Sequence, residues 1–168
     1  MGAAEILRRL EERGETLAVA ESLTGGLLAA TIVDVPGAST VFRGGLVVYA
    51  TDLKHTLAGV PAGLLAARGP VDAEVAVAMA AGARERCGAD WALATTGVAG
   101  PGPADGVSAG TVFVAVAGPD GSSSVRSLHL PGDRAAVRSG TVAAALRLLA
   151  DRLDLRSGEG PGTSGVPV

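Results

Sequence analysis

The stretch Ala20-Glu21-Ser22-Leu23-Thr24-Gly25-Gly26 decides how the rest of the chain is arranged. A short apolar run, residues 16–20, precedes it, and a longer apolar run rich in alanine, residues 27–35, follows it. This order predicts a strand, a tight turn and a helix. Two hydroxyl groups and a pair of glycines therefore fall at a turn where the N-terminus of a helix leaves backbone N–H groups without partners.

Two roles are open to Ser22 at this turn. Serine is among the commonest residues at helix N-termini, where its hydroxyl caps a free N–H group. A serine between a strand and a helix can also be an exposed nucleophile. Thr24, Gly25 and Gly26 extend the second interpretation, because glycines at a helix N-terminus let an anionic substrate approach the backbone closely. Glu21 either orders the turn, binds a ribose hydroxyl or forms a structural ion pair.

The composition fits one domain with an aliphatic core. Hydrophobic residues make up 48% of the 168 residues but aromatic residues only 2%, so the core must consist of Ala, Val and Leu. The net charge of −3, with scattered basic residues, argues against nucleic acid as a partner. No secretory signal and no membrane-spanning run is visible, so we expect a cytoplasmic protein. We expect residues 1–155 to form the domain and residues 156–168, rich in Gly, Ser and Pro, to be a flexible tail.

Few side chains are suited to a metal ion or a disulfide. His55 and His129 lie far from other potential ligands, so we expect no metal and no other cofactor. Cys87 is the only cysteine, which excludes an internal disulfide and favours a structural thiol.

Apolar runs typical of strands alternate with helical patterns along the chain. The helical patterns cover residues 3–13, 24–33, 51–59, 61–68 and 72–88 and begin again at residue 133. The strands are expected at residues 16–20, 46–49, 91–95, 111–117 and 124–130. A turn signal at residues 118–121 predicts an antiparallel hairpin between the last two strands. The order indicates an α/β fold with helices on both faces of a mixed, mostly parallel sheet.

Three of these strands end in residues that can carry out chemistry, at residues 22–26, 49–54 and 96–101. If the strands are parallel, their carboxyl ends meet at one edge of the sheet and share one cleft. A serine hydroxyl attacks only when a base takes its proton. Lys54 could be that base if desolvation lowers its pKa, although a lone lysine on a helix would be interpreted as solvated.

Tyr49 and Arg134 each have a chemical and a plain structural interpretation, and three glycines could take part through their backbone. Tyr49 could relay a proton or hold the lysine amine, or it is a strand-end tyrosine with its hydroxyl in water. Backbone N–H groups of Gly25-Gly26 or Gly97 could stabilise an oxyanion. Arg134, after a predicted helix cap, could pair with a phosphate or carboxylate, or it is an ordinary surface arginine.

Five motifs in the same order resemble the C-terminal domain family of the competence/damage-inducible protein CinA, including its stand-alone, PncC-type members. The motifs are Ala-Glu-Ser-Leu-Thr-Gly-Gly at 20–26, Val-Val-Tyr-Ala-Thr-Asp-Leu-Lys at 47–54, Thr-Gly-Val-Ala-Gly-Pro at 96–101, Gly-Thr-Val at 110–112 and Gly-Asp-Arg at 132–134. The resemblance covers residues 3–153.

The resemblance implies a nicotinamide-nucleotide amidase, which converts nicotinamide mononucleotide to nicotinic acid mononucleotide and ammonia without a metal. It implies a three-layer α/β/α sandwich, usually a homodimer, with Ser22 as nucleophile, Lys54 as base and Tyr49 as an assisting residue. We expect the residues that bind the nucleotide to lie on the same motifs: Glu21, Thr24, Gly25, Gly26, Thr96, Gly97, Gly100 and Arg134.

The chain departs from the family pattern at two places. Residues 102–109 lack the lysine of a Glu-Lys-Pro-Val segment, and Asp72 stands where the family tends to have serine. Both departures concern substrate contacts more than the catalytic pair. The alternative function is a non-catalytic nucleotide-binding module linked to competence or the DNA-damage response, which the same glycine loops and Arg134 would serve. An esterase or amidase for another small substrate is a third interpretation.

Overall fold

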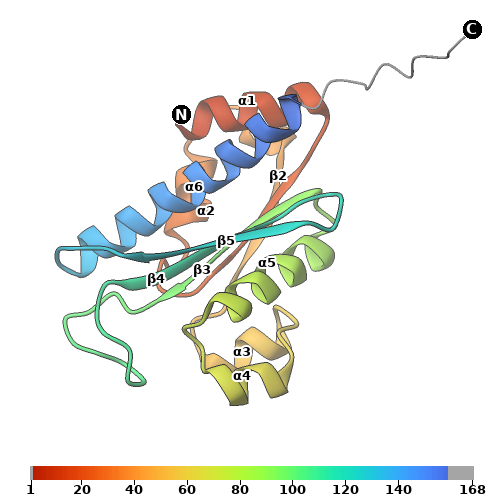
Figure 1. Ribbon diagram of the computed structural model, residues 1–168. Coiled ribbons are helices and arrows are strands. Elements are labelled where there is room, and N and C mark those ends of the chain that lie inside the picture. Colours follow the sequence, from red (N-terminus) through yellow and green to blue (C-terminus); the bar gives the residue numbers. More distant parts are fainter. Residues whose placement is uncertain (1, 159–168) are drawn as a thin grey trace, which may run out of the picture.

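A five-stranded sheet lies between two layers of helices in the computed structural model, which describes residues 2–158 (Figure 1). The strands, in the order in which they lie in the sheet, are β2 (Phe42–Val47), β1 (Leu17–Glu21), β3 (Trp91–Gly97), β4 (Thr111–Ala117) and β5 (Ser123–His129). β1 pairs in parallel with β2 and β3, whereas β4 is antiparallel to both β3 and β5. β5 thus runs in the direction of β1, β2 and β3, which confirms a mixed, mostly parallel sheet.

Helices cover both faces of this sheet. They are α1 (Ala3–Arg13), α2 (Leu27–Val33), the short 3-10 helix η1 (Ala38–Thr40), α3 (Thr51–Thr56), α4 (Ala62–Arg68), α5 (Ala73–Cys87) and α6 (Arg134–Gly158). α1, α2 and α6 share one apolar core with the sheet, and α5 shares a second core with the opposite face. The predicted three-layer arrangement is confirmed.

The second core is close-packed because its side chains are small. Asp72 is the N-cap of α5, because its Oδ1 atom accepts hydrogen bonds from the N–H groups of Glu74 and Val75. Most of the buried residues of α5 are alanines. The helix approaches the backbone beside it so closely that a Cβ at Gly82 would lie 1.6 Å from the Ala58 carbonyl oxygen. A core poor in aromatic residues is therefore filled by close contact between backbones.

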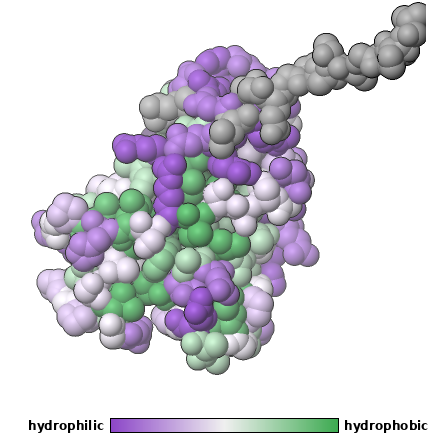
Figure 2. All heavy atoms as spheres, viewed as in Figure 1, coloured by the Kyte–Doolittle hydropathy of each residue, from purple (hydrophilic) through white to green (hydrophobic). Residues whose placement is uncertain are grey.

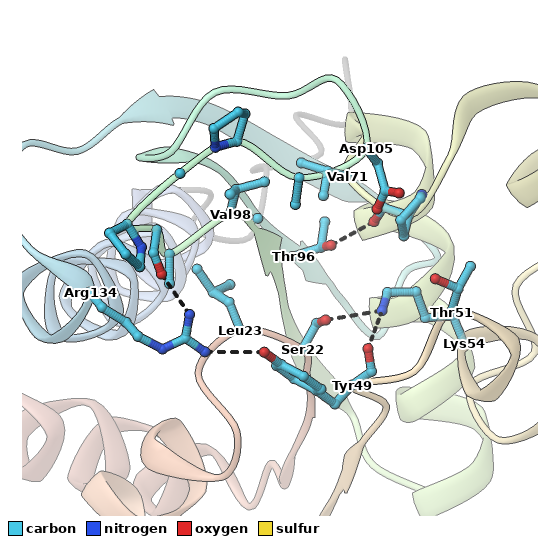
Figure 3. A pocket seen from close by; sticks show the side chains of 18 residues that line it. Ser22, Leu23, Tyr49, Thr51, Lys54, Val71, Thr96, Val98, Asp105 and Arg134 are labelled. Carbon is cyan, nitrogen blue, oxygen red and sulfur yellow. Dashed lines mark hydrogen bonds between the residues drawn. The ribbon is translucent and has the colours of Figure 1, made fainter.

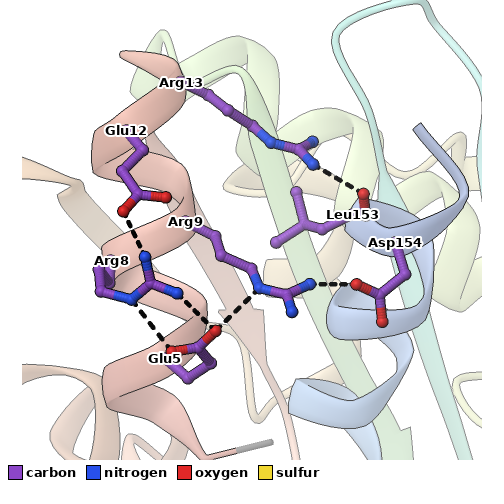
Figure 4. Close-up of polar contacts among 7 residues, drawn as sticks. All are labelled: Glu5, Arg8, Arg9, Glu12, Arg13, Leu153 and Asp154. Carbon is purple, nitrogen blue, oxygen red and sulfur yellow. Dashed lines mark hydrogen bonds and ion pairs between the residues drawn. The ribbon is translucent and has the colours of Figure 1, made fainter. Parts of the chain in front are cut away.

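Polar contacts also join the first helix to the last. Arg9 forms an ion pair with Asp154, and Arg13 Nη2 donates to the Leu153 carbonyl oxygen at 2.7 Å (Figure 4). Exposed ion pairs contribute little to stability, so the docking of α1 depends mainly on buried side chains such as Leu10. Figure 2, seen from the same side as Figure 1, shows apolar side chains across the middle of the molecule, where β5 forms the edge of the sheet.

Two predicted boundaries were wrong for a reason visible in the backbone. The strand expected at residues 46–49 is β2, which ends at Val47 and includes Gly44 and Gly45. It is an edge strand with alternating exposure rather than a buried one. A Cβ at Gly45 would lie 2.5 Å from Val19 Cγ2, so glycine there allows the close approach of β1. The helix expected from residue 24 begins at Leu27, after two glycines of positive φ.

The predicted tail needs a correction at its start. α6 continues to Gly158, so residues 156–158 are helical. The remainder of the predicted tail, residues 159–168, lies outside the described residues. No helix within residues 2–158 combines the length and the apolar character needed to cross a bilayer.

Candidate active site

The carboxyl ends of β1, β2 and β3 meet at one edge of the sheet, because these three neighbouring strands are parallel. A cavity of about 360 Å³ opens there (Figure 3). Its lining includes Ser22, Tyr49, Lys54, Thr96, Gly97, Gly100 and Arg134. The structure therefore brings seven of the eleven expected site residues together, from segments up to about a hundred positions apart.

Ser22 lies directly beyond the end of the central strand β1. Its N–H group donates to the Thr95 carbonyl oxygen at 3.0 Å, so the ladder between β1 and β3 extends one residue further. The chain then reverses, and the N–H group of Gly25 donates to the Ser22 carbonyl oxygen at 3.0 Å. Ser22 is only 7% exposed but lines the cavity. The backbone of Ser22 is thus held by the sheet on one side and by the turn on the other.

Lys54 approaches Ser22 from α3, the helix that follows β2. Its Nζ atom lies 3.0 Å from Ser22 Oγ, 2.8 Å from the Val48 carbonyl oxygen and 3.5 Å from the Tyr49 carbonyl oxygen. The side chain is 1% exposed, and none of the ion pairs within residues 2–158 involves it. Burial lowers the pKa of Lys54 to about 8. The prediction of a desolvated lysine beside Ser22 is confirmed.

The three neighbours of the amine suit both of its protonation states, because an ammonium group can donate to all three oxygens and a neutral amine can also be accommodated. A neutral amine has two N–H groups and one lone pair. The carbonyl oxygens of Val48 and Tyr49 can only accept, whereas the hydroxyl of Ser22 can donate. Two N–H groups of Lys54 can therefore donate to the carbonyls while its lone pair accepts the Ser22 proton, which is the geometry of a nucleophile and its base.

Lys54 is also the only lysine among the 168 residues, and all other strongly basic side chains are arginines. An arginine does not lose its proton in proteins, whereas a buried lysine does. The one lysine of the sequence thus stands at the position where a titratable amine contacts a serine.

Tyr49 contacts Lys54 in a way that differs from the expectation. Its side chain is 60% exposed, and its hydroxyl accepts a hydrogen bond from Arg134 Nη2 at 3.1 Å. Only the backbone carbonyl of Tyr49 reaches the amine. The expected relay through the phenol is therefore corrected: the phenol instead positions Arg134.

Arg134 lies at the mouth of the cavity, on the first residue of α6. Nη1 donates to the Gly100 carbonyl oxygen at 2.7 Å, and Nη2 donates to the phenol of Tyr49. Both partners are neutral, and the ion pairs found in the described part of the chain do not include Arg134. Its positive charge therefore remains available to an anionic group at the mouth.

Thr96 and Gly97 form the wall of the cavity at the end of β3. Thr96 Oγ1 donates to the Pro70 carbonyl oxygen at 2.6 Å, which ties β3 to the segment before α5. A Cβ at Gly97 would lie 2.6 Å from Val112 Cγ1 and 2.7 Å from the Thr111 carbonyl oxygen. Gly97 is thus required by the close approach of β4.

The other four expected residues are not part of the cavity lining. Glu21 is fully buried, and its carboxylate accepts hydrogen bonds from the N–H groups of Leu28 at 2.8 Å and Ala29 at 3.0 Å. Of its three interpretations, ordering the turn is the one that these contacts fit. The carboxylate occupies the start of α2, where an anionic substrate was expected to bind.

Thr24, Gly25 and Gly26 also have structural roles. Thr24 is fully buried and shares a hydrogen bond of 2.8 Å with the hydroxyl of Thr95. Gly25 and Gly26 have φ angles of +58° and +99°, which allow the tight turn after Ser22. These residues do not line the cavity, and the structure shows them shaping the turn; their contact with a substrate stays a prediction.

Two further residues near the site were not among the expected ones. Asp105 lines the mouth of the cavity at a φ of +51°. It forms a two-residue turn with Gly106, for which the pair Asp-Gly is a known signal. Arg138 donates to the Leu23 carbonyl oxygen at 3.0 Å and to the Thr24 carbonyl oxygen at 2.9 Å. Its spacing of four residues from Arg134 on one helix was the available signal.

Comparison with known sequences identifies the family. The family model described as the CinA C-terminal domain matches residues 2–153. A CinA-like protein of Frankia casuarinae is 55% identical over 144 residues, which cover 86% of this chain and 33% of that protein. A CinA-like protein of Geobacter sulfurreducens is 50% identical over 149 residues, which cover 88% of this chain and 36% of that protein. The chain thus spans about a third of the length of these relatives.

Comparison with solved structures agrees. A CinA superfamily protein from Klebsiella pneumoniae superposes with a TM-score of 0.87 at 32% identity, over 91% of this chain and 96% of that one. The competence/damage-inducible protein CihA from Agrobacterium tumefaciens gives a TM-score of 0.82 at 33% identity, over 90% and 95% of the two chains. From its sequence motifs, its fold and these matches, the chain belongs to the CinA C-terminal domain family.

Proposed function

We propose that this chain is a nicotinamide-nucleotide amidohydrolase, which converts nicotinamide mononucleotide and water to nicotinic acid mononucleotide and ammonia. The observation that carries the proposal is the contact of 3.0 Å between Lys54 Nζ and Ser22 Oγ. Burial lowers the pKa of this lysine to about 8. A purely structural lysine gains nothing from burial beside a hydroxyl, because desolvation of its charge is costly. Family membership supports the proposal, although the relatives' names do not state an activity.

The proposed reaction has two halves that use the same pair of residues. In the first, Lys54 takes the proton of Ser22, and Oγ attacks the carboxamide carbon. The carbon–nitrogen bond then breaks, the proton passes from Lys54 to the leaving nitrogen, and ammonia departs from an ester on Ser22. In the second, Lys54 takes a proton from water, the hydroxide attacks the ester carbon, and the proton returns to Ser22 as the acid leaves.

The cavity suits a nucleotide in size and charge. A volume of about 360 Å³ falls within the usual range for small-molecule sites. Arg134 stands at the mouth with only neutral partners, so a 5′-phosphate there would meet an unpaired cation. In this arrangement the phosphate lies near the mouth while the carboxamide reaches Ser22 at the floor.

Ammonia release from nicotinamide mononucleotide tests the proposal. We expect turnover by the wild type, and a fall in kcat of about 10³-fold or more in Ser22→Ala and Lys54→Met, because either change removes half of the nucleophile–base pair. Lys54→Arg should be equally inactive, since it retains a positive charge but not a base. Ser39→Ala, at an exposed serine far from the cavity lining, is the matched control.

The alternative function predicts binding without ammonia release. A non-catalytic nucleotide-binding module would bind the nucleotide without releasing ammonia, and Lys54→Arg would leave that binding unchanged. This result, obtained with a wild type shown to be folded by the fluorescence of its single, buried tryptophan, Trp91, would overturn the amidase.

A further inference from the structure

The turn that carries Ser22 is held from outside by one side chain of the last helix. Arg138 lies on α6, and its guanidinium group donates from Nε to the Leu23 carbonyl oxygen at 3.0 Å and from Nη2 to the Thr24 carbonyl oxygen at 2.9 Å. These are the two residues that directly follow Ser22. The contact links positions more than a hundred residues apart, so it can form only in the folded protein.

The two hydrogen bonds are the evident reason for an arginine at this position. Arg138 is half-buried, and none of the ion pairs in the described chain gives it a carboxylate partner. It also lies near the N-terminal end of α6, where the helix dipole disfavours a positive charge. The rigid, planar fork of arginine suits two neighbouring carbonyl groups, which a lysine ammonium could not hold in the same way.

Besides the hydrogen bonds that Thr24 makes with Thr95 and with the N–H group of Leu27, the guanidinium group of Arg138 fixes the orientation of the turn. Gly25 and Gly26 have no side chains and allow a wide range of backbone angles. A Cβ at Gly25 would lie 3.7 Å from Arg138 Nη2, so the guanidinium lies against the turn itself. Since each peptide group is planar, holding the carbonyls of Leu23 and Thr24 also fixes the direction of the peptide groups that lead away from Ser22.

We propose that Arg138 is a positioning residue for catalysis, because it holds the turn after Ser22 so that the hydroxyl stays within reach of Lys54. Arg138 does not line the cavity, so it acts through the turn and not on the substrate. A displacement of about 1 Å at a reacting group can cost about a hundredfold in rate. This inference rests on the proposed function and adds a residue outside the cavity to the machinery of the same site.

Steady-state kinetics separate this role from its alternatives. For Arg138→Met we expect kcat to fall about 10- to 100-fold while KM stays within about twofold, because the hydroxyl loses its alignment but the substrate keeps its contacts. Arg138→Lys should recover part of the loss, since an ammonium group can hold one of the two carbonyls. Arg147→Met, at an exposed arginine of the same helix, is the matched control and should leave both constants unchanged.

Two kinetic outcomes would overturn the inference. A rise in KM at constant kcat would make Arg138 a substrate-binding residue. Arg138→Met could instead melt at a lower temperature than the wild type but have the wild-type kcat at a temperature where it is folded. This result would show that Arg138 contributes only to stability.

A serine-directed probe distinguishes failure of this inference from failure of the proposed function. A fluorophosphonate reacts with an activated serine whatever amide the site hydrolyses. We expect rapid modification of Ser22 in the wild type, shown by mass spectrometry, and slower modification by about 10-fold or more in folded Arg138→Met. Slower labelling supports the inference even if nicotinamide mononucleotide is not a substrate. Equal labelling rates would overturn the role of Arg138 alone, whereas no labelling of the wild type would overturn both this inference and the activated serine of the proposed function.

Discussion

Two glycine-containing turns follow neighbouring strands of the sheet, and they have different roles. The turn at residues 22–26, after β1, carries Ser22, the proposed nucleophile, but N–H groups at the start of α2 are occupied by the carboxylate of Glu21. The turn at residues 97–102, after β3, has no such internal anion and lines the cavity along its whole length. At the first turn these N–H groups are occupied by the protein itself, whereas the second turn faces the cavity.

The difference shows that glycines at a helix N-terminus do not by themselves make an anion site. The same free N–H groups that attract a phosphate also attract a carboxylate of the chain. Glu21 is the residue directly before Ser22, so the sequence that supplies the nucleophile also fills the anion position. A charged substrate must then find its partner elsewhere, and Arg134 is the available cation at the mouth.

Replacing Glu21 with glutamine is expected to produce the largest loss of stability among the changes that test this comparison. The substitution places an amide NH₂ group against a backbone N–H of α2, in a site that is fully buried. We expect a loss of roughly 2–3 kcal/mol in the free energy of unfolding, because hydrogen bonds to a charged acceptor are lost and a buried donor is left without a partner. Urea denaturation followed by Trp91 fluorescence measures it.

The matched control for this change is Glu12→Gln. Glu12 is an exposed residue of α1 whose ion pair with Arg8 contributes little. Equal stability of the Glu21 and Glu12 variants would mean that Glu21 does not hold the first turn, and the contrast between the two turns would be lost.

A pair of alanine substitutions tests the second turn. In Gly97→Ala the new Cβ meets the Thr111 carbonyl oxygen at 2.7 Å, and we expect a loss of about 2 kcal/mol because backbone atoms cannot move aside cheaply. In Gly102→Ala the new Cβ has no neighbour within 4 Å, so stability should be unchanged. Melting temperatures compare the two variants. A melting temperature of Gly97→Ala equal to the wild-type value would show that β4 does not press against this turn.

The dependence of rate on pH tests the first turn, where Lys54 must be neutral to act as base. With a pKa lowered to about 8, the neutral fraction rises from about a tenth at pH 7 to about nine tenths at pH 9. We therefore expect kcat/KM to increase about tenfold over this range and then level off. A profile that falls as pH rises through 8 would mean that the protonated amine is the active form.

Much of the fold could be predicted from the sequence, because local patterns decide it. The apolar face of α1, the N-cap Asp72 and the hairpin of β4 and β5 each follow from residues close together in the chain. The pairing of Ser22 with Lys54 was also predictable, since parallel strands bring their carboxyl ends together. The exposed edge strand β2 was misplaced because its two glycines, typical of a turn, instead serve close contact with β1.

The contacts that the sequence did not reveal all depend on distant partners. The spacing of Arg138 from Arg134 places both on one face of α6 but does not indicate that Arg138 reaches the carbonyl oxygens of Leu23 and Thr24. The direction of the Tyr49 side chain, toward Arg134 rather than toward Lys54, is likewise set by the packing of α6 against the cavity mouth. Sequence patterns predict which residue types gather at an edge of a sheet, but tertiary packing decides which atoms meet.

The pKa of Lys54 tests the central claim most directly. Because the sequence has a single lysine, protein made with lysine labelled with ¹³C at the ε carbon gives one side-chain signal to titrate by NMR. The account predicts a midpoint near 8 in the folded protein, and a midpoint near the ordinary value of 10.5 in urea. A folded-state midpoint at or above 10 would contradict this claim. A lysine with so high a pKa stays protonated at neutral pH and could not serve as the base for Ser22.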